Sequence, residues 1–249
     1  MKTSITTIVW GKMHSLPKFR KVVREAKEIG YDGVGLETRL LPLEAIKDPG
    51  LVKKALSDAG IENAGSYSTM KDSDVGWASR AGTPLLWVVA RGDHTFDEAV
   101  RAVDHLASLA SKSGITIALH NHLGTPFETE PQMRKVLREV KGLHVCLDTG
   151  HAEATKIDTK RFIHDFGERI ALVHVKDLRA RLPKDKVSIT KDFVTVGEGI
   201  VDFPKIFASL KDAGYSGSLM LEIEALEGKS PDELAGEGYR RIQGFLRGI

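Results

Sequence analysis

The stretch ITIALHNH, residues 115–122, carries the pattern that decides the fold. Ile115, Ile117 and Leu119 alternate with smaller residues, and His120 and His122 share the parity of those smaller residues. Successive side chains of a β-strand point to opposite faces of the sheet. We therefore expect the aliphatic face to pack against helices and the histidines to face an interior surface, as in a parallel sheet covered by helices.

Four more segments follow the same rule, and each ends near a residue that can bind a metal ion or transfer a proton. The segments are YDGVGLE (31–37), LHVCLD (143–148), IALVHVKD (170–177) and SLMLEIE (218–224). Their reactive residues are Glu37, Asp148, His174, Lys176 and Glu222. Because a closed parallel barrel collects the carboxyl ends of its strands at one mouth, we expect these side chains to meet there.

A unit of amphipathic helix, glycine and strand recurs along the chain, for example VKKALSDAG (52–60) before IENAGSY (61–67). Glycine ends a helix by adopting a left-handed conformation. Strands at 4–10, 61–67 and 83–90 bring the expected total to eight, and a helix over 231–247 closes the ring. The sequence predicts an α/β fold, a single (β/α)8 TIM barrel domain over residues 1–249. A doubly wound sheet is the alternative, but its G-x-G-x-x-G motif is missing after the first strand.

Composition agrees with one domain and narrows the function classes. A chain of 249 residues with 41% hydrophobic content suits a single α/β barrel. The net charge is +2 and no basic block is present, which argues against nucleic acid or a membrane surface as partner. Cys146 is the single cysteine, so no intrachain disulfide is possible, and the N-terminus lacks a long apolar stretch. We expect a cytoplasmic protein.

Six motifs, in order along the chain, resemble the xylose isomerase-like barrel superfamily of sugar isomerases, epimerases, inosose dehydratases and type IV endonucleases. They are GYDGVGLE, LHNHLGTPFET, CLDTGHAEA, VHVKD, GEGIVDFPKIFASLKDAGYSG and LMLEIE. The resemblance implies one divalent metal ion at the mouth, with manganese favoured and magnesium, cobalt or zinc as alternatives. The ligands it implies are His120, Asp148, His174 and Glu222. Relatives in this superfamily often form homodimers or homotetramers.

The chemistry of these four residues agrees with such a site. Two carboxylates and two imidazoles suit first-row divalent ions better than calcium, which prefers oxygen ligands alone. A metal with open positions can hold a carbonyl and a neighbouring hydroxyl and stabilise an enediolate. We therefore expect an isomerase or epimerase for a small keto-sugar, polyol or cyclitol, with Glu222, His120 and Lys176 as the candidates for proton transfer.

Two departures from the family pattern bear on the reaction. In the epimerase branch a glutamate stands where this chain has His120, and Gly35 stands where many relatives resemble a GVEL pattern. Three alternatives follow: the imidazole replaces the carboxylate, Glu128 reaches back from the following loop, or epimerisation is not the activity. Because HNHLGT resembles the loop of inosose dehydratases, a lyase that acts on a keto-cyclitol or keto-sugar is the second reading.

Three of the candidates could instead have a purely structural role. Asp148 could simply cap the next helix, and His174 could be a satisfied core histidine. Arg91 could bind a substrate oxyanion or form a salt bridge. The remaining expected substrate contacts are Glu37, His122, Glu128, His151 and Lys176.

Two other classes stay open. An abasic-site endonuclease needs further histidines after the third and fourth strands, where AGSY and VVARGD stand, and a basic surface for DNA. A barrel that binds sugar or protein without turnover remains open because of His120. The long charged segment 179–199 is a candidate lid over the mouth.

Overall fold

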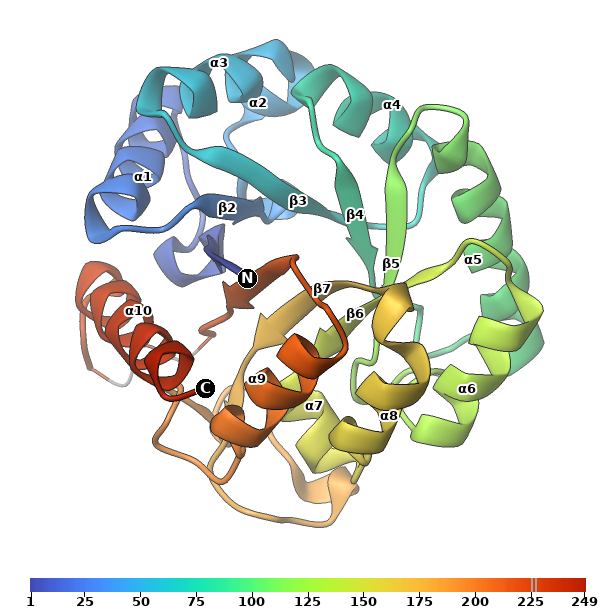
Figure 1. Cartoon of the computed structure of the whole chain (residues 1–249). Helices are drawn as coiled ribbons and strands as arrows, with labels where there is room; N and C mark the ends of the chain where they lie inside the picture. Colours follow the sequence, from blue (N-terminus) through green and yellow to red (C-terminus); the bar gives the residue numbers. More distant parts are fainter. Residues whose placement is uncertain (225, 227) are drawn as a thin grey trace.

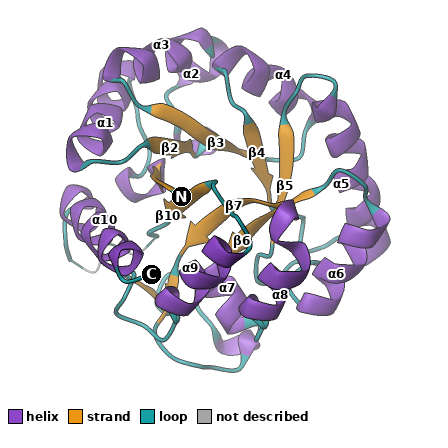
Figure 2. Cartoon of the chain, viewed as in Figure 1, coloured by secondary structure: helices purple, strands orange, loops and turns teal. Residues whose placement is uncertain are grey.

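Eight parallel strands close into a barrel in the order β1-β10-β7-β6-β5-β4-β3-β2. This is a computed structural model, which describes residues 1–224, 226 and 228–249. Apart from the small sheet β8–β9, the order around the ring follows the order along the chain, and helices surround the strands on the outside (Figures 1 and 2). The predicted (β/α)8 TIM barrel is confirmed.

The barrel strands are short, and most side chains of the mouth lie at or just beyond their ends. The bounds are β1 Lys2–Thr6, β2 Gly33–Leu36, β3 Glu62–Ser68, β4 Leu85–Val88, β5 Thr116–His120, β6 His144–Asp148, β7 Ile170–Val175 and β10 Ser218–Leu221. Lys176 and Glu222 therefore follow their strands directly, and His122 lies two residues beyond β5. The strand expected at 4–10 is shorter, because a 3-10 turn, η1 (Thr7–Trp10), replaces its second half.

The outer layer consists of helices of very different lengths. They are α1 Leu16–Ile29, α2 Leu43–Lys47, α3 Gly50–Ala59, α4 Asp72–Ala81, α5 Phe96–Ser111, α6 Glu130–Glu139, α7 Thr149–Ala154, α8 Thr159–Phe166, α9 Phe203–Asp212 and α10 Pro231–Arg247. Gly60 ends α3 in the left-handed conformation, with φ +63°, and its N–H donates to the carbonyls of Leu56 and Ser57. None of the helices that the structure describes combines the length and apolar character that a membrane span requires.

The period-2 pattern of the strands separates two cores. Outward side chains such as Ile117, Leu119 and Val173 join the large core between the barrel and the helices. Inward side chains form a smaller cluster inside the barrel: Leu85, Trp87, Ala118, Cys146, Leu172 and Met220. His120, Asp148 and His174 share the inward parity of this cluster, so the predicted division of the faces is confirmed.

The segment expected as a lid has its own structure. Strands β8 (Asp177–Leu178) and β9 (Phe193–Val194) pair antiparallel, and the turn η4 (Lys184–Lys186) lies between them. The Asp177 carboxylate accepts the N–H groups of Gly197 and Gly199 at 2.8 and 2.9 Å. A Cβ at Gly199 would lie 2.3 Å from Asp177 Oδ1, which explains the glycine there. Whether the segment moves as a lid stays a prediction.

Gly35 is required by the packing inside the barrel. A Cβ at this position would lie 2.3 Å from Met220 Sδ and 3.2 Å from Trp87 Cη2. Both neighbours are buried within the barrel. No side chain fits at Gly35 while Met220 fills this space.

We expect Gly35→Ala to destabilise the protein by about 1–3 kcal/mol, because it overpacks the barrel interior. Urea denaturation followed by circular dichroism measures the change. Combining Gly35→Ala with Met220→Ala should cost less than the sum of the two single variants. As a control, Gly76→Ala in α4, where nothing lies within 4 Å of the added Cβ, should be neutral or stabilise by about 0.5–1 kcal/mol. An additive double variant would contradict the packing conflict.

Candidate active site

A cavity of about 200 Å³ opens at the carboxyl ends of the strands. Its lining residues are Glu37, Arg39, Tyr67, Trp87, Val89, His120, His122, His174, Glu222 and Glu224. They come from the ends of β2, β3, β4, β5, β7 and β10. We call this cavity the mouth; it has the position where barrel enzymes carry their chemistry.

Asp148, His174 and Glu222 converge beside the mouth. One ligand atom from each lies within 4.8 Å of the others. His174 Nδ1 is 2.7 Å from Glu222 Oε2 and 4.0 Å from Asp148 Oδ2. All three side chains are at most 8% exposed. Two buried carboxylates and an imidazole at this separation fit the ligand set of a first-row divalent ion.

Lys176 places an ammonium group among these carboxylates. Its Nζ donates to Glu222 Oε1 at 2.6 Å and to Glu224 Oε2 at 3.2 Å, and it lies 3.7 Å from Asp148 Oδ2. Burial by itself would lower the pKa of Lys176, but the three carboxylates outweigh burial and raise it. Lys176 therefore stays charged, and it helps to hold the pKa of Glu222 well below its usual value against the opposing effect of burial.

His120 lies next to this group: it is within hydrogen-bond distance of Asp148, and its ring centroid is 5.0 Å from that of His174. His120 Nε2 is 3.2 Å from Asp148 Oδ2, and Nδ1 is buried without a hydrogen-bond partner among the described residues. Burial lowers the pKa of His120 to about 4, although Asp148 opposes the change. The imidazole is thus neutral at pH 7, as a metal ligand or a proton acceptor must be.

The structure bears on the two structural roles considered for the ligand candidates: Asp148 as a helix cap and His174 as a core histidine. Asp148 does cap α7, because its Oδ1 accepts the N–H of His151 at 2.8 Å, yet its other oxygen, Oδ2, faces His120 and Lys176. The cap and the site therefore use different oxygens. His174 belongs to the charged cluster of the site rather than to an apolar core, because its Nδ1 forms a 2.7 Å ion pair with Glu222, while its Nε2 has no hydrogen-bond partner among the described residues.

Glu37 lines the mouth, as expected. It is 2% exposed, and its Oε2 accepts from Arg39 Nε at 2.9 Å. Burial raises the pKa of Glu37 to about 7, with Arg39 opposing and Glu222 adding to the shift. A carboxyl group with this pKa can either accept or release a proton near neutral pH.

His122 and His151 form a cluster of tilted rings with His120 at one side of the site. The rings of His122 and His151 are 4.3 Å apart, and those of His120 and His122 are 5.4 Å apart. His151 Nδ1 accepts the N–H of Leu123 at 3.2 Å. His122 lines the mouth, whereas His151 is buried behind it.

Arg91 and Glu128 lie outside the mouth. Arg91 pairs with Asp93 at 2.6 Å, and both side chains are about two-thirds exposed. Glu128 accepts the N–H of Gly124 at 2.8 Å and pairs with Lys184 of the segment 179–199. Of the two expectations for Arg91, a substrate contact or a salt bridge, the structure shows the salt bridge. Glu128 does not reach back toward His120. Neither residue is brought together with the other candidates.

Sequence reasoning missed several residues that hold the site together. Asn121 Nδ2 donates to the carbonyl of Asp148 at 3.1 Å, and Asn121 Oδ1 accepts the Asp148 N–H at 2.8 Å. Thr149 Oγ1 donates to the carbonyl of Lys176 at 2.7 Å and accepts its N–H at 3.0 Å. Both lie beside a predicted site residue, where the strand pattern expects an aliphatic side chain. A polar residue at a position where an aliphatic one is expected is the sequence signal that could have identified Asn121 and Thr149.

Arg39, Tyr67 and Glu224 also belong to the mouth. The parity of SLMLEIE placed Glu224 on the same face as Glu222, and the ion pair with Lys176 gives it a partner. No sequence signal pointed to Arg39 or Tyr67, which pack together because the turn after β2 lies beside the end of β3.

The sequence matches the family model described as xylose isomerase-like TIM barrel over residues 23–247. Inosose dehydratase from Geobacillus thermodenitrificans is 28% identical over 143 residues, which cover 53% of this chain and 48% of that protein. The chain thus spans about half the length of the curated relatives it matches.

Two solved structures share the whole fold. L-ribulose 3-epimerase superposes with a TM-score of 0.79 at 15% identity, covering 99% of this chain and 94% of the other. The IolI protein, whose structure contains a zinc atom, superposes with a TM-score of 0.78 at 18% identity, covering 99% and 96%. At this identity the likeness concerns the fold.

We expect Asn121→Ala to weaken metal binding about 10- to 100-fold, because it frees the backbone that positions Asp148. Isothermal titration with Mn²⁺ measures the affinity, and thermal unfolding measures the stability. Asn63→Ala is the matched control, since Asn63 also bonds across strands but pairs with Thr83 away from the site. Equal affinity in the two variants would argue against the positioning role of Asn121.

Proposed function

The chain belongs to the family of xylose isomerase-like TIM barrels, and from this premise we propose that it is a divalent-metal-dependent enzyme. In this proposal it isomerises or epimerises a small keto-sugar or polyol through an enediolate. The observation that carries the proposal is the convergence of Asp148, His174 and Glu222 next to a charged Lys176 at the barrel mouth. The metal ion is the finer part of the proposal, with Mn²⁺ first and Mg²⁺, Co²⁺ or Zn²⁺ as alternatives.

The proposed ligands are Asp148, His174 and Glu222, with His120 as the fourth. When bound, the ion supplies electrostatic stabilisation for the negative charge that develops on two neighbouring substrate oxygens. Glu222 accepts the proton from the carbon between these oxygens, and Lys176 fixes the orientation of the Glu222 carboxylate through its 2.6 Å hydrogen bond. Lys176, which does not itself line the mouth but contacts Glu222 at its wall, is the proposed proton donor to a substrate oxygen held against Glu222.

A lyase is the second candidate, because the residue at the end of β5 is His120. Epimerisation removes a proton from one face of the reacting carbon and returns a proton to the opposite face, so it needs an acid or base on each side. Loss of water needs one base for the proton and one acid for the departing hydroxyl. Glu222 supplies the base. Glu37, with a pKa of about 7, supplies the acid from another wall of the mouth. The inosose dehydratases among the relatives support this alternative.

The first experiment is elemental analysis of the purified protein after dialysis, with and without added Mn²⁺. We expect about one ion per chain and its loss in Asp148→Asn, His174→Ala and Glu222→Gln, because each removes one ligand of a three- or four-residue site. His164→Ala is the control, since this histidine is 85% exposed and pairs with Asp165. Metal retained in two of the three variants would rule out the proposed ligand set.

Incubation with ketoses and inososes in heavy water separates the two reactions. An isomerase or epimerase should incorporate deuterium at the carbon next to the carbonyl and conserve the mass of the substrate apart from deuterium. A dehydratase should give a product lighter by one water. Mass spectrometry reads both outcomes, and the metal-free protein should produce neither.

Replacing Lys176 tests the proton-transfer role. We expect Lys176→Met to lower the turnover number about 10²- to 10⁴-fold, because it removes a general acid and releases the Glu222 carboxylate. The variant should retain metal, which elemental analysis checks. Lys186→Met is the matched control, since Lys186 is 71% exposed and its one ion pair among the described residues is with Asp185. A turnover number equal to that of the unmodified protein would remove Lys176 from the mechanism.

A further inference from the structure

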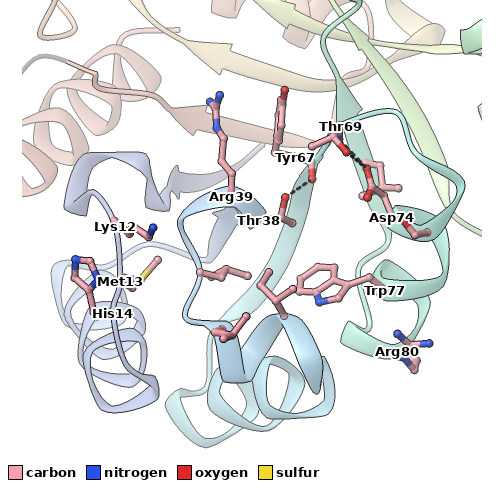
Figure 3. A pocket seen from close by; sticks show the side chains of 15 residues that line it. Lys12, Met13, His14, Thr38, Arg39, Tyr67, Thr69, Asp74, Trp77 and Arg80 are labelled. Carbon is pink, nitrogen blue, oxygen red and sulfur yellow. Dashed lines mark hydrogen bonds between the residues drawn. The ribbon is translucent and has the colours of Figure 1, made fainter.

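A second cavity, of about 720 Å³, adjoins the mouth. It lies between the segments that follow β1, β2 and β3, and residues of α2 and α4 line it (Figure 3). Arg39 and Tyr67 line both cavities. The Arg39 guanidinium sits 4.6 Å above the Tyr67 ring, and its Nε bonds to Glu37 in the mouth. The side chains of Arg39 and Tyr67 therefore stand at the boundary of the two spaces.

One part of this second cavity is apolar and open to solvent. Leu43 is 63% exposed and Ile46 is 36% exposed, and both line it. Trp77 contributes its ring, whose Nε1 already donates to the carbonyl of Ala45 at 3.3 Å. Exposed apolar residues that line a hollow are typical of a binding site.

The polar part of the second cavity is positively charged. Figure 3 shows Lys12 on one side and Arg80 on the other, with Arg39 at the edge toward the mouth. Neither Lys12 nor Arg80 forms an ion pair with any residue that the structure describes. Asp74 is the acidic residue of the lining, and its Oδ2 already accepts from Ser68 and Thr69. An anionic group would complement these cations.

The sizes of the two spaces suggest how they are used. Cavities that bury a drug-sized ligand measure roughly 300–1,000 Å³. The mouth, at about 200 Å³, is below this range, while the second cavity, at about 720 Å³, is within it. The mouth therefore suits a small polyol unit alone, and a larger ligand would extend past Arg39 and Tyr67.

We propose that the second cavity binds the apolar, anionic part of a substrate whose polyol part occupies the mouth. The substrate class is then a sugar or cyclitol that carries an aromatic or aliphatic group with a carboxylate, rather than a free monosaccharide. The polyol half of this statement rests on the proposed function. The binding of an apolar anion in the second cavity does not depend on it.

The probe is 2-naphthoate, which joins an apolar ring system to one carboxylate, titrated calorimetrically into metal-free protein. We expect one naphthoate per chain, with quenching of tryptophan fluorescence through Trp77. Ile46→Asp should weaken binding about tenfold or more, because it places a negative charge in the cavity. Ile200→Asp is the matched control, since Ile200 is 40% exposed and lies outside the lining; it should bind naphthoate normally.

A second pair of variants tests the charge. Arg80→Gln should weaken naphthoate binding, whereas Arg138→Gln should not, although each arginine stands in the last turn of its helix, α4 or α6. Asp148→Asn should bind naphthoate normally. Binding that survives Ile46→Asp and disappears in Asp148→Asn would place the probe in the mouth and overturn the proposal.

The connection between the two cavities is tested in manganese-loaded protein. Naphthoate bound beside the Arg39–Tyr67 wall should show proton resonances broadened by the paramagnetic ion, and Asp148→Asn should abolish this broadening. Bound naphthoate without broadening would overturn the proposal that one substrate occupies both cavities. Failure of metal binding appears separately, in the elemental analysis, and leaves the naphthoate titration interpretable.

A second copy of the chain is the competing occupant of the cavity. Sedimentation velocity distinguishes it from a ligand. If the unmodified protein does not bind naphthoate and Ile46→Asp converts an oligomer into monomers while Ile200→Asp does not, the apolar rim is a subunit contact and the proposal is overturned. Naphthoate binding by the unmodified protein, with the same sedimentation coefficient in both variants, supports the ligand.

Discussion

The buried contact of Lys176 with Glu222, and the nearby Asp148, is the constraint on which the rest of the site depends. Buried charges are costly unless they are paired and hydrogen-bonded, so every neighbouring group has to be placed accurately. Asn121 and Thr149 meet this demand by tying the ends of β5, β6 and β7 together. The strands of the barrel carry the charged groups, and the hydrogen bonds of Asn121 and Thr149 fix the distances between them. A divalent ion would add the further positive charge that two adjacent carboxylates favour.

Much of this could be predicted from the sequence, because strand alternation is a local property. The parity of ITIALHNH and LHVCLD alone puts His120 and Asp148 on the interior face, and closure of the barrel does the rest. The contact of Arg39 with Tyr67 could not be predicted, because it depends on how the turn after β2 packs against the end of β3 in the next βα unit. The position of Glu128 outside the mouth could not be predicted either, because its partner, Lys184, lies 56 residues away in the segment 179–199.

Packing inside the barrel also explains where the acidic residue of β2 is found. Met220 and Trp87 occupy the space next to Gly35, so an inward side chain at that level of the strand is excluded. Glu37 is on the same face two residues later, at the level of the mouth, and Arg39 holds it there. In this chain the carboxyl group therefore enters the cavity from Glu37, two residues beyond Gly35.

The single carboxylate of Asp177 also has a meaning for how such a barrel can diversify. It accepts N–H groups from both sides of a long excursion, those of Leu178, Gly197, Gly199 and Val201. The two ends of the excursion are thereby joined next to β7, whatever the chain does between them. Insertions, deletions and substitutions within 179–192 can then accumulate without disturbing His174 or Lys176. Natural variation, or a laboratory library confined to this stretch, can sample new surfaces above an unchanged barrel mouth.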